Sequence, residues 1–96
     1  MKWISTTIKR KWMDKILSGE KRVEFKGMTD FWKTRLLPLC GRGDVAINFL
    51  CGRESYKYNV LVVEGFFDDL DDGAYKDIDG VRYNEWFEIT LGGRIE

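Results

Sequence analysis

The chain has 96 residues, 16 basic and 16 acidic side chains, two Cys and no His. This length allows one domain with a modest core, and the aromatic fraction of 15% supplies large side chains to fill it. The absence of His excludes triads and any other imidazole base, so catalysis would depend on Lys, carboxylates, Tyr, Thr or an oxygen-bound metal.

Neither a membrane segment nor a metal site is expected from the sequence. No apolar run approaches the roughly 20 residues that cross a bilayer, and residues 1–7 lack the apolar stretch of a signal peptide. A cytoplasmic protein without membrane association is therefore expected. Cys40 and Cys51 have no His partners and no evident carboxylate ligands, so we expect two buried, reduced thiols, no metal and no cofactor.

The charge is distributed unevenly along the chain. Residues 1–42 hold eleven Lys or Arg against four acidic residues, a net charge of +7, and residues 43–96 have a net charge of −7. One interpretation is a mixed surface on which the halves neutralise each other. The other is a basic face for a phosphate-bearing partner with an acidic face opposite it.

The first elements predicted along the chain are a strand and a short helix. Residues 3–9 alternate as a strand does, and residues 11–18 predict a helix of about two turns that Gly19 ends. The apolar stripe of this helix predicts core positions for Trp12, Met13 and Ile16.

A second strand and a second helix follow. The strand spans residues 21–26, and Thr29 or Asp30 caps a helix that runs through Leu37. Pro38 closes this helix, because proline cannot continue the hydrogen-bond pattern.

The second half of the chain predicts strands. Residues 45–51 form an almost continuous apolar run, and residues 56–67 predict a long strand with a bulge or bend at Gly65. Asp79-Gly80 is a tight-turn signal before a last strand at residues 86–91. Together the elements predict an α/β (α+β) fold, a small mixed β-barrel with two short helices.

The segment after the first helix carries more charge than a strand needs in order to fold. Val23 and Phe25 alternate with charged residues, so we predict that they face the core and that Glu24 and Lys26 face away from it. Lys21 shares the parity of Val23, which places it at a rim or cleft, because an unpaired buried ammonium is costly. Ordinary alternatives are a lysine that reaches out to water and a solvated cross-strand ion pair.

The order Ile-Leu-Ser-Gly-x-Lys-x-x-Glu-x-Lys over residues 16–26 resembles the signature of the ASCH domains, small relatives of the PUA fold. The family pattern is Gly-x-Lys-x-x-Glu-x-Arg after a first helix, so Lys26 stands where the family usually has Arg and lacks its bidentate fork. Residues 86–96 also resemble the family's last strand. The resemblance therefore covers residues 1–96 as one domain and implies a PUA-like barrel of the small stand-alone bacterial or phage type.

The resemblance and the basic residues lead to one main functional hypothesis. We expect RNA or a nucleotide-like ligand to bind in a basic cleft between the first helix and the barrel. Lys9-Arg10-Lys11 is a basic cluster suited to phosphates, although the neighbouring Trp12 is expected in the core. The expected ligand-binding residues are Lys9, Arg10, Lys21, Glu24, Lys26 and Arg35.

Two other functional classes remain open. Relatives that resemble amidohydrolases of acylated nucleosides have a catalytic lysine that matches Lys21, and others resemble ribonucleases, so Lys21 and Glu24 are the candidate catalytic residues. The amidohydrolase pattern has Thr where this chain has Glu24, and Glu64 is only a candidate for its later glutamate. The other class is a phage-type protein-interaction module that contacts a protein partner through the acidic half.

Overall fold

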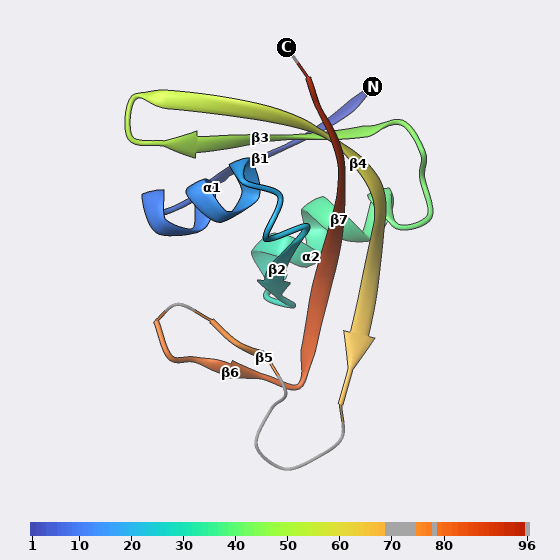
Figure 1. Cartoon of the computed structure of the whole chain (residues 1–96). Helices are drawn as coiled ribbons and strands as arrows, with labels where there is room; N and C mark the ends of the chain where they lie inside the picture. Colours follow the sequence, from blue (N-terminus) through green and yellow to red (C-terminus); the bar gives the residue numbers. More distant parts are fainter. Residues whose placement is uncertain (69–74, 78, 96) are drawn as a thin grey trace.

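The computed structural model describes residues 1–68, 75–77 and 79–95, and its main feature is one curled five-stranded sheet (Figure 1). The elements in chain order are β1 (Lys2–Thr7), α1 (Arg10–Leu17), β2 (Val23–Gly27), α2 (Asp30–Leu36), the 3₁₀ helix η1 (Leu37–Leu39), β3 (Val45–Cys51), β4 (Glu54–Phe67), β5 (Tyr75–Lys76), β6 (Arg82–Tyr83) and β7 (Glu85–Ile95).

The sheet has the strand order β1-β3-β4-β7-β2, and its curl makes it a half-barrel. β1 runs parallel to β3, whereas β3–β4, β4–β7 and β7–β2 are antiparallel. β1 and β2 are therefore the two edge strands, at opposite ends of the strand order. The expected small mixed α+β fold with two short helices is confirmed.

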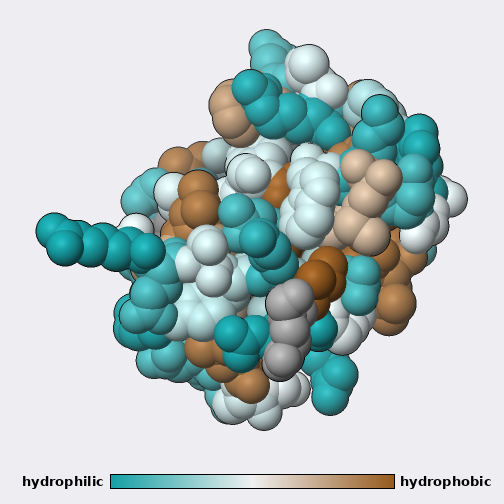
Figure 2. All heavy atoms as spheres, turned by 90° about the horizontal axis from the view of Figure 1, so that it is seen from above, coloured by the Kyte–Doolittle hydropathy of each residue, from teal (hydrophilic) through white to brown (hydrophobic). Residues whose placement is uncertain are grey.

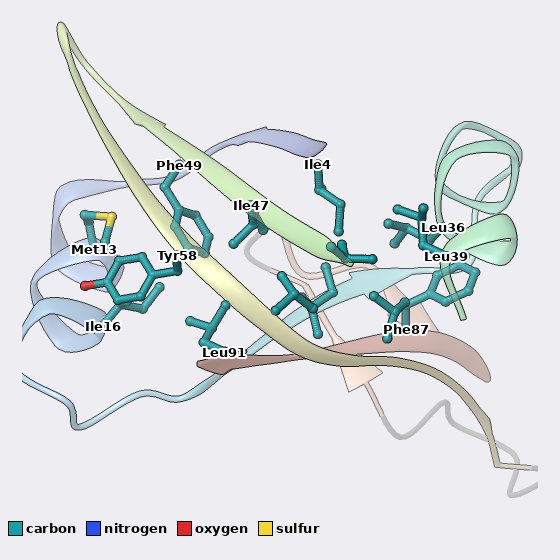
Figure 3. Close-up of a cluster of buried hydrophobic side chains, with 14 of the residues drawn as sticks. Ile4, Met13, Ile16, Leu36, Leu39, Ile47, Phe49, Tyr58, Phe87 and Leu91 are labelled. Atoms are coloured by element: carbon teal, nitrogen blue, oxygen red, sulfur yellow. The ribbon is translucent and has the colours of Figure 1, made fainter. Parts of the chain in front are cut away.

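The two helices cover opposite ends of the core, as Figure 3 shows. At one end α1 packs Met13 and Ile16 near Phe49, Tyr58 and Leu91, and at the other end Leu36 and Leu39 lie near Phe87. Met13, Leu36, Ile47, Phe49, Phe87 and Ile89 are fully buried.

The predicted end of the first helix and the predicted cap of the second are confirmed, whereas α2 ends at Leu36 and Pro38 lies within the 3₁₀ helix η1 that follows it. Gly19, two residues after the last residue of α1, has a φ of +82°, and its N–H donates to Ile16 O at 3.0 Å. This conformation ends the helix. Thr29 caps α2, because its hydroxyl accepts a hydrogen bond from Trp32 N at 3.3 Å.

The irregularity of β4 lies elsewhere than expected. The register with β7 shifts between Tyr58 and Val62, whereas Gly65 pairs regularly with Phe87, so the prediction of a bulge at Gly65 was wrong. A Cβ at Gly65 would lie 3.3 Å from the terminal methyl of Met28, so the glycine leaves room for that side chain.

A two-stranded hairpin, β5–β6, lies beside the main sheet and was not predicted apart from its turn. The carboxylate of Asp77 accepts hydrogen bonds from Asp79 N and Val81 N, both at 2.9 Å, and Gly80 has a φ of +84°. The turn expected at Asp79-Gly80 is therefore confirmed.

Aromatic rings attach this hairpin to β2. Tyr75 stacks on Phe25 with ring centroids 5.7 Å apart, and Tyr83 stacks on Tyr75 at 5.9 Å. A Cβ at Gly27 would lie 2.5 Å from the Tyr83 ring, so only glycine admits this close approach. The hairpin is thereby fixed over the end of an edge strand.

The two cysteines are not bonded to each other. Cys51 is buried in the core as expected, whereas Cys40 is only half-buried, because it follows η1 at the surface. Burial is also the main reason that the pKa of the Cys40 thiol is raised.

Within residues 1–68, 75–77 and 79–95, no helix is long and apolar enough to cross a membrane. The same residues contain no group of three or more Cys, Asp or Glu side chains that could hold a metal ion. The acidic run at 68–72 lies outside the described residues, apart from Asp68. Figure 2, which views the molecule from the end where the chain termini lie, shows mostly hydrophilic residues with hydrophobic ones scattered among them.

Candidate ligand-binding cleft

A cleft of about 580 Å³ opens between the end of β1, the start of α1, the edge strand β2 and the β5–β6 hairpin. This volume is in the range of small-molecule sites. The lining residues are Thr7, Ile8, Lys9, Trp12, Lys21, Glu24, Phe25, Lys26, Tyr75, Lys76, Asp77 and Asp79.

The orientation of β2 is opposite to the one predicted. Glu24 pairs with Ile89 and Lys26 with Phe87, and both partners are fully buried. Because directly paired residues of an antiparallel ladder lie on the same face, Glu24 and Lys26 face the core side of the sheet. The expectation that Val23 and Phe25 would be core residues was therefore wrong, as was the expectation that Glu24 and Lys26 would face away from the core.

The reason for the reversed orientation is the position of β2 at the edge of an incomplete barrel. On the core-facing side, the charged side chains border the cleft instead of entering a closed interior. Phe25 belongs to the other face of β2, where Tyr75 stacks on its ring, and both rings line the cleft at this strand edge; Phe25 is half-buried without lying in the core.

Lys21 and Glu24 form an ion pair at the wall of the cleft. Lys21 Nζ lies 3.4 Å from Glu24 Oε1, and the two side chains are only 17% and 12% exposed. Nζ also donates to the carbonyl of Val23 at 2.5 Å, and Glu24 Oε1 accepts from the backbone N–H of Phe25 at 2.9 Å. These bonds hold both charged groups in place and satisfy polar groups of the edge strand.

Lys26 lies in the same cleft but has different surroundings. Its Nζ is 5.0 Å from the ring centroid of Trp32, and within the described part of the chain it forms neither a hydrogen bond nor an ion pair. Burial is the main cause that lowers the pKa of Lys26; the nearby carboxylate of Glu24 raises this pKa, and the smaller effect of the Lys21 charge lowers it.

The hairpin supplies the rim of the cleft. The Tyr75 hydroxyl donates to the carbonyl of Phe25 at 3.3 Å, so hairpin and edge strand are joined by a hydrogen bond as well as by stacking. Burial, together with Glu24 and Asp77, raises the pKa of Tyr75 to about 12. Tyr75 therefore stays neutral at physiological pH.

Trp12 lines the cleft and is only half-buried, so its predicted place in the core was wrong. Met13 and Ile16 take the core positions of α1, which turns Trp12 toward the opening. Lys11 and Lys15 lie over the Trp12 ring, with Nζ 5.0 Å and 5.6 Å from its centroid. The ring thus lies beside cations at one wall of the cleft.

Four of the six expected binding residues meet in this cleft: Lys9, Lys21, Glu24 and Lys26. The other two, Arg10 and Arg35, do not line it. Arg35 Nη1 donates to Phe31 O at 2.9 Å, and its guanidinium lies over the Phe31 ring on α2.

Arg10 belongs to a separate surface cluster. Its guanidinium donates to the Tyr56 hydroxyl at 3.2 and 3.3 Å and forms longer ion pairs of 3.7 Å with Asp14 and Glu54. The Tyr56 hydroxyl in turn donates to Glu54. The position of Arg10 at the start of α1 directs it toward β4 instead of the cleft.

Sequence reasoning missed the lining residues of the hairpin, Tyr75, Lys76, Asp77 and Asp79. The only signal for this hairpin was the Asp79-Gly80 turn, since two-residue strands are too short to show alternation. Because the hairpin belongs to the acidic half of the sequence, the cleft combines residues from both halves. The basic and acidic halves of the sequence therefore do not form separate basic and acidic faces at this cleft.

Comparisons of the chain with protein-family models, with curated proteins and with solved structures found no match.

Proposed function

We propose that the cleft binds single-stranded RNA or a nucleotide-like ligand, and that the chain is a small PUA-like ASCH domain. The observation that carries this proposal is the gathering of Lys9, Lys21, Lys26 and Lys76 with Trp12 in one cleft of about 580 Å³. Amines bind phosphate oxygens without regard to sequence, and an aromatic ring that borders a cleft, as Trp12 does, can stack on any base.

Glu24 adds a hydrogen-bond acceptor close to the lysines, while the other two carboxylates of the cleft, Asp77 and Asp79, lie on the hairpin. Its Oε1 already accepts the N–H of Phe25 and faces Lys21, whereas Oε2 has no partner among the described residues. A carboxylate oxygen accepts from the amino group of a base, as Glu and Asp do with cytosine. Lysines on phosphate and Glu24 on a base edge are compatible roles within one nucleotide.

A second hollow supports a ligand longer than one nucleotide. It has a volume of about 270 Å³, and Lys21 borders it as well as the main cleft. Arg22 and Arg94 are among its lining residues. A strand whose base occupies the main cleft would pass Lys21 and meet these two guanidinium groups with its next phosphate.

The contacts of Lys21 favour a binding role over a hydrolytic one. Its ammonium protons are already engaged by Glu24 and by the carbonyl of Val23, whereas a catalytic base or nucleophile needs the free amine. Hydrolysis of acylated cytidine or RNA by the wild-type protein, abolished in Lys21→Ala, would support the hydrolase instead.

The test of the proposal is fluorescence anisotropy of a labelled single-stranded RNA at increasing salt. We expect affinity to fall with salt, with a logarithmic slope of about −0.7 for each phosphate contact. Lys9→Ala should weaken binding and reduce the slope by about one contact. Lys57→Ala is the matched control, since Lys57 is exposed and lines neither hollow.

The role of Trp12 is tested in the same assay. Trp12→Ala should lose roughly 1–3 kcal/mol of binding free energy if a base stacks there, and Trp12→Phe should retain most of it. Absence of binding at low ionic strength, or equal losses in the Lys9 and Lys57 variants, would refute the proposed function.

A further inference from the structure

Lys26 differs in its surroundings from Lys21, the other lysine that β2 and its start bring to the cleft. It faces the core side of β2 opposite the fully buried Phe87, and it is half-buried. Within the described residues its amine has no hydrogen-bond or ion-pair partner, and it lies 5.0 Å from the centroid of the Trp32 ring. Its neighbour Lys21 has both a carboxylate and a carbonyl partner.

The amines of Lys21 and Lys26 therefore have different surroundings within one cleft. Lys21 is fixed as an ammonium by acceptors, whereas Lys26 is half-buried and, within the described residues, has no hydrogen-bonded or ion-paired acceptor; the charges of Glu24 and Lys21 act on it in opposite directions. Removal from water and a neighbouring positive charge are the two conditions that activate a lysine as a nucleophile. The direction of the pKa shift of Lys26 agrees with this geometry.

We propose that Lys26 is a nucleophilic amine that captures a small aldehyde bearing an anionic group as a reversible imine. The neutral amine attacks the carbonyl carbon, a C–N bond forms, and the carbonyl π electrons move to oxygen. A proton passes from nitrogen to that oxygen to give a carbinolamine. Loss of the hydroxyl group with the second nitrogen proton releases one water and leaves the C=N bond, so no oxidant or reductant is needed.

The anionic group follows from the other charges of the cleft. Lys9 and Lys76 line the same space and can pair with a carboxylate or phosphate on the aldehyde. Asp77 and Asp79 line it as well, but the Asp77 carboxylate already accepts the N–H groups of Asp79 and Val81. Glu24 borders the cleft on the same face of β2 as Lys26, and its carboxylate can relay the proton that the amine releases. The proposal uses the cleft but does not require that a nucleotide binds there.

The experiment is reductive trapping of the full chain with glyoxylate, a small anionic aldehyde, and sodium cyanoborohydride near neutral pH. Peptide mass spectrometry then ranks the lysines by rate of labelling, with the amino terminus counted separately because α-amines react readily. We expect Lys26 to be labelled first among the lysines, ahead of the exposed Lys57. Propionaldehyde, which lacks the anionic group, should label Lys26 more slowly than glyoxylate does.

Two charge-conserving variants complete the test. Lys26→Arg keeps the positive charge but removes the nucleophile, so the fast lysine adduct should be lost. Lys57→Arg, at an exposed position outside the cleft, should keep the adduct at Lys26. Labelling of Lys26 no faster than Lys57 in the wild-type protein, or first labelling at Lys21, would overturn the proposal, and neither result depends on the stability of a variant.

Discussion

Glu24 makes structural contacts in β2 and also lines the cleft, so the Glu24→Ala substitution is the most informative test of stability. The substitution removes the acceptor of the Phe25 N–H at 2.9 Å and the carboxylate 3.4 Å from Lys21 Nζ, at a position that is only 9% exposed. A hydrogen bond to a charged group contributes about 1.5–3 kcal/mol. In the variant, Lys21 still donates to the Val23 carbonyl and can be hydrated in the cleft, which limits the cost of losing its carboxylate partner. We therefore expect the free energy of unfolding to fall by about 2 kcal/mol.

Urea and thermal unfolding measure this loss. For a domain of this size, about 2 kcal/mol lowers the Tm by roughly 8–16 °C. Glu24→Gln should lose less, because an amide oxygen still accepts the Phe25 N–H. A double-mutant cycle with Lys21→Met should show a coupling energy of at least about 0.5 kcal/mol.

A loss below about 0.5 kcal/mol for Glu24→Ala would contradict this reasoning. It would mean that Glu24 is a solvated side chain of an edge strand and that the inward orientation of β2 is wrong.

Three further predictions concern the hairpin and the surface. Gly27→Ala should cost about 1–3 kcal/mol by overpacking, because its Cβ would meet the Tyr83 ring at 2.5 Å, and faster proteolysis of the hairpin should report the undocking. Tyr75 has a pKa of about 12 in the fold against 10.0 otherwise, so the stability due to its neutral hydroxyl is complete below pH 10 and disappears as the pH rises towards 12. In Tyr75→Phe, the free energy of unfolding should no longer show this decrease between pH 10 and 12. A pH profile identical to that of the wild type would argue against the buried hydroxyl. Arg42 holds the pKa of Asp44 at about 2 through bonds of 2.6 and 2.8 Å, so Arg42→Ala should return that pKa towards 3.8 in an NMR titration; a pKa that stays near 2 would exclude Arg42 as the cause.

Strands with a continuous or long apolar pattern could be predicted from the sequence. β3 occupies Val45–Cys51, the predicted bounds, because its run of apolar residues is buried between two neighbouring strands. The orientation of β2 could not be predicted in the same way. Alternation shows which residues share a face of the strand. It identifies the core-facing side only when the polar face is in water, whereas the charged face of β2 borders a cleft.

The cleft was partly predictable. The spacing of Lys21, Glu24 and Lys26 indicated that β2 and the residues just before it form part of the site. The structure places all three residues at the opening of the half-barrel. The opposite wall depends on contacts between distant segments. Phe25 and Tyr75 are fifty residues apart, and no local pattern indicates that their rings stack.

The position of Trp12 shows a second limit. Trp12 and Met13 are adjacent on a short helix, and hydrophobicity favours either of them for the core. Met13 is fully buried, while Trp12 borders the cleft, where its ring is in contact with lysine side chains. Which of two apolar neighbours is buried depends on the angle at which the helix meets the sheet.

If the open side of the half-barrel is the ligand site, an NMR titration of backbone amides with a short single-stranded RNA should reveal it. We expect the largest shifts to cluster at residues 21–26 and 75–77 and at the Trp12 indole, while amides of the β3–β4 turn at Gly52 stay unchanged. Shifts confined to the Arg10–Tyr56 cluster, or no shifts at low ionic strength, would contradict this expectation.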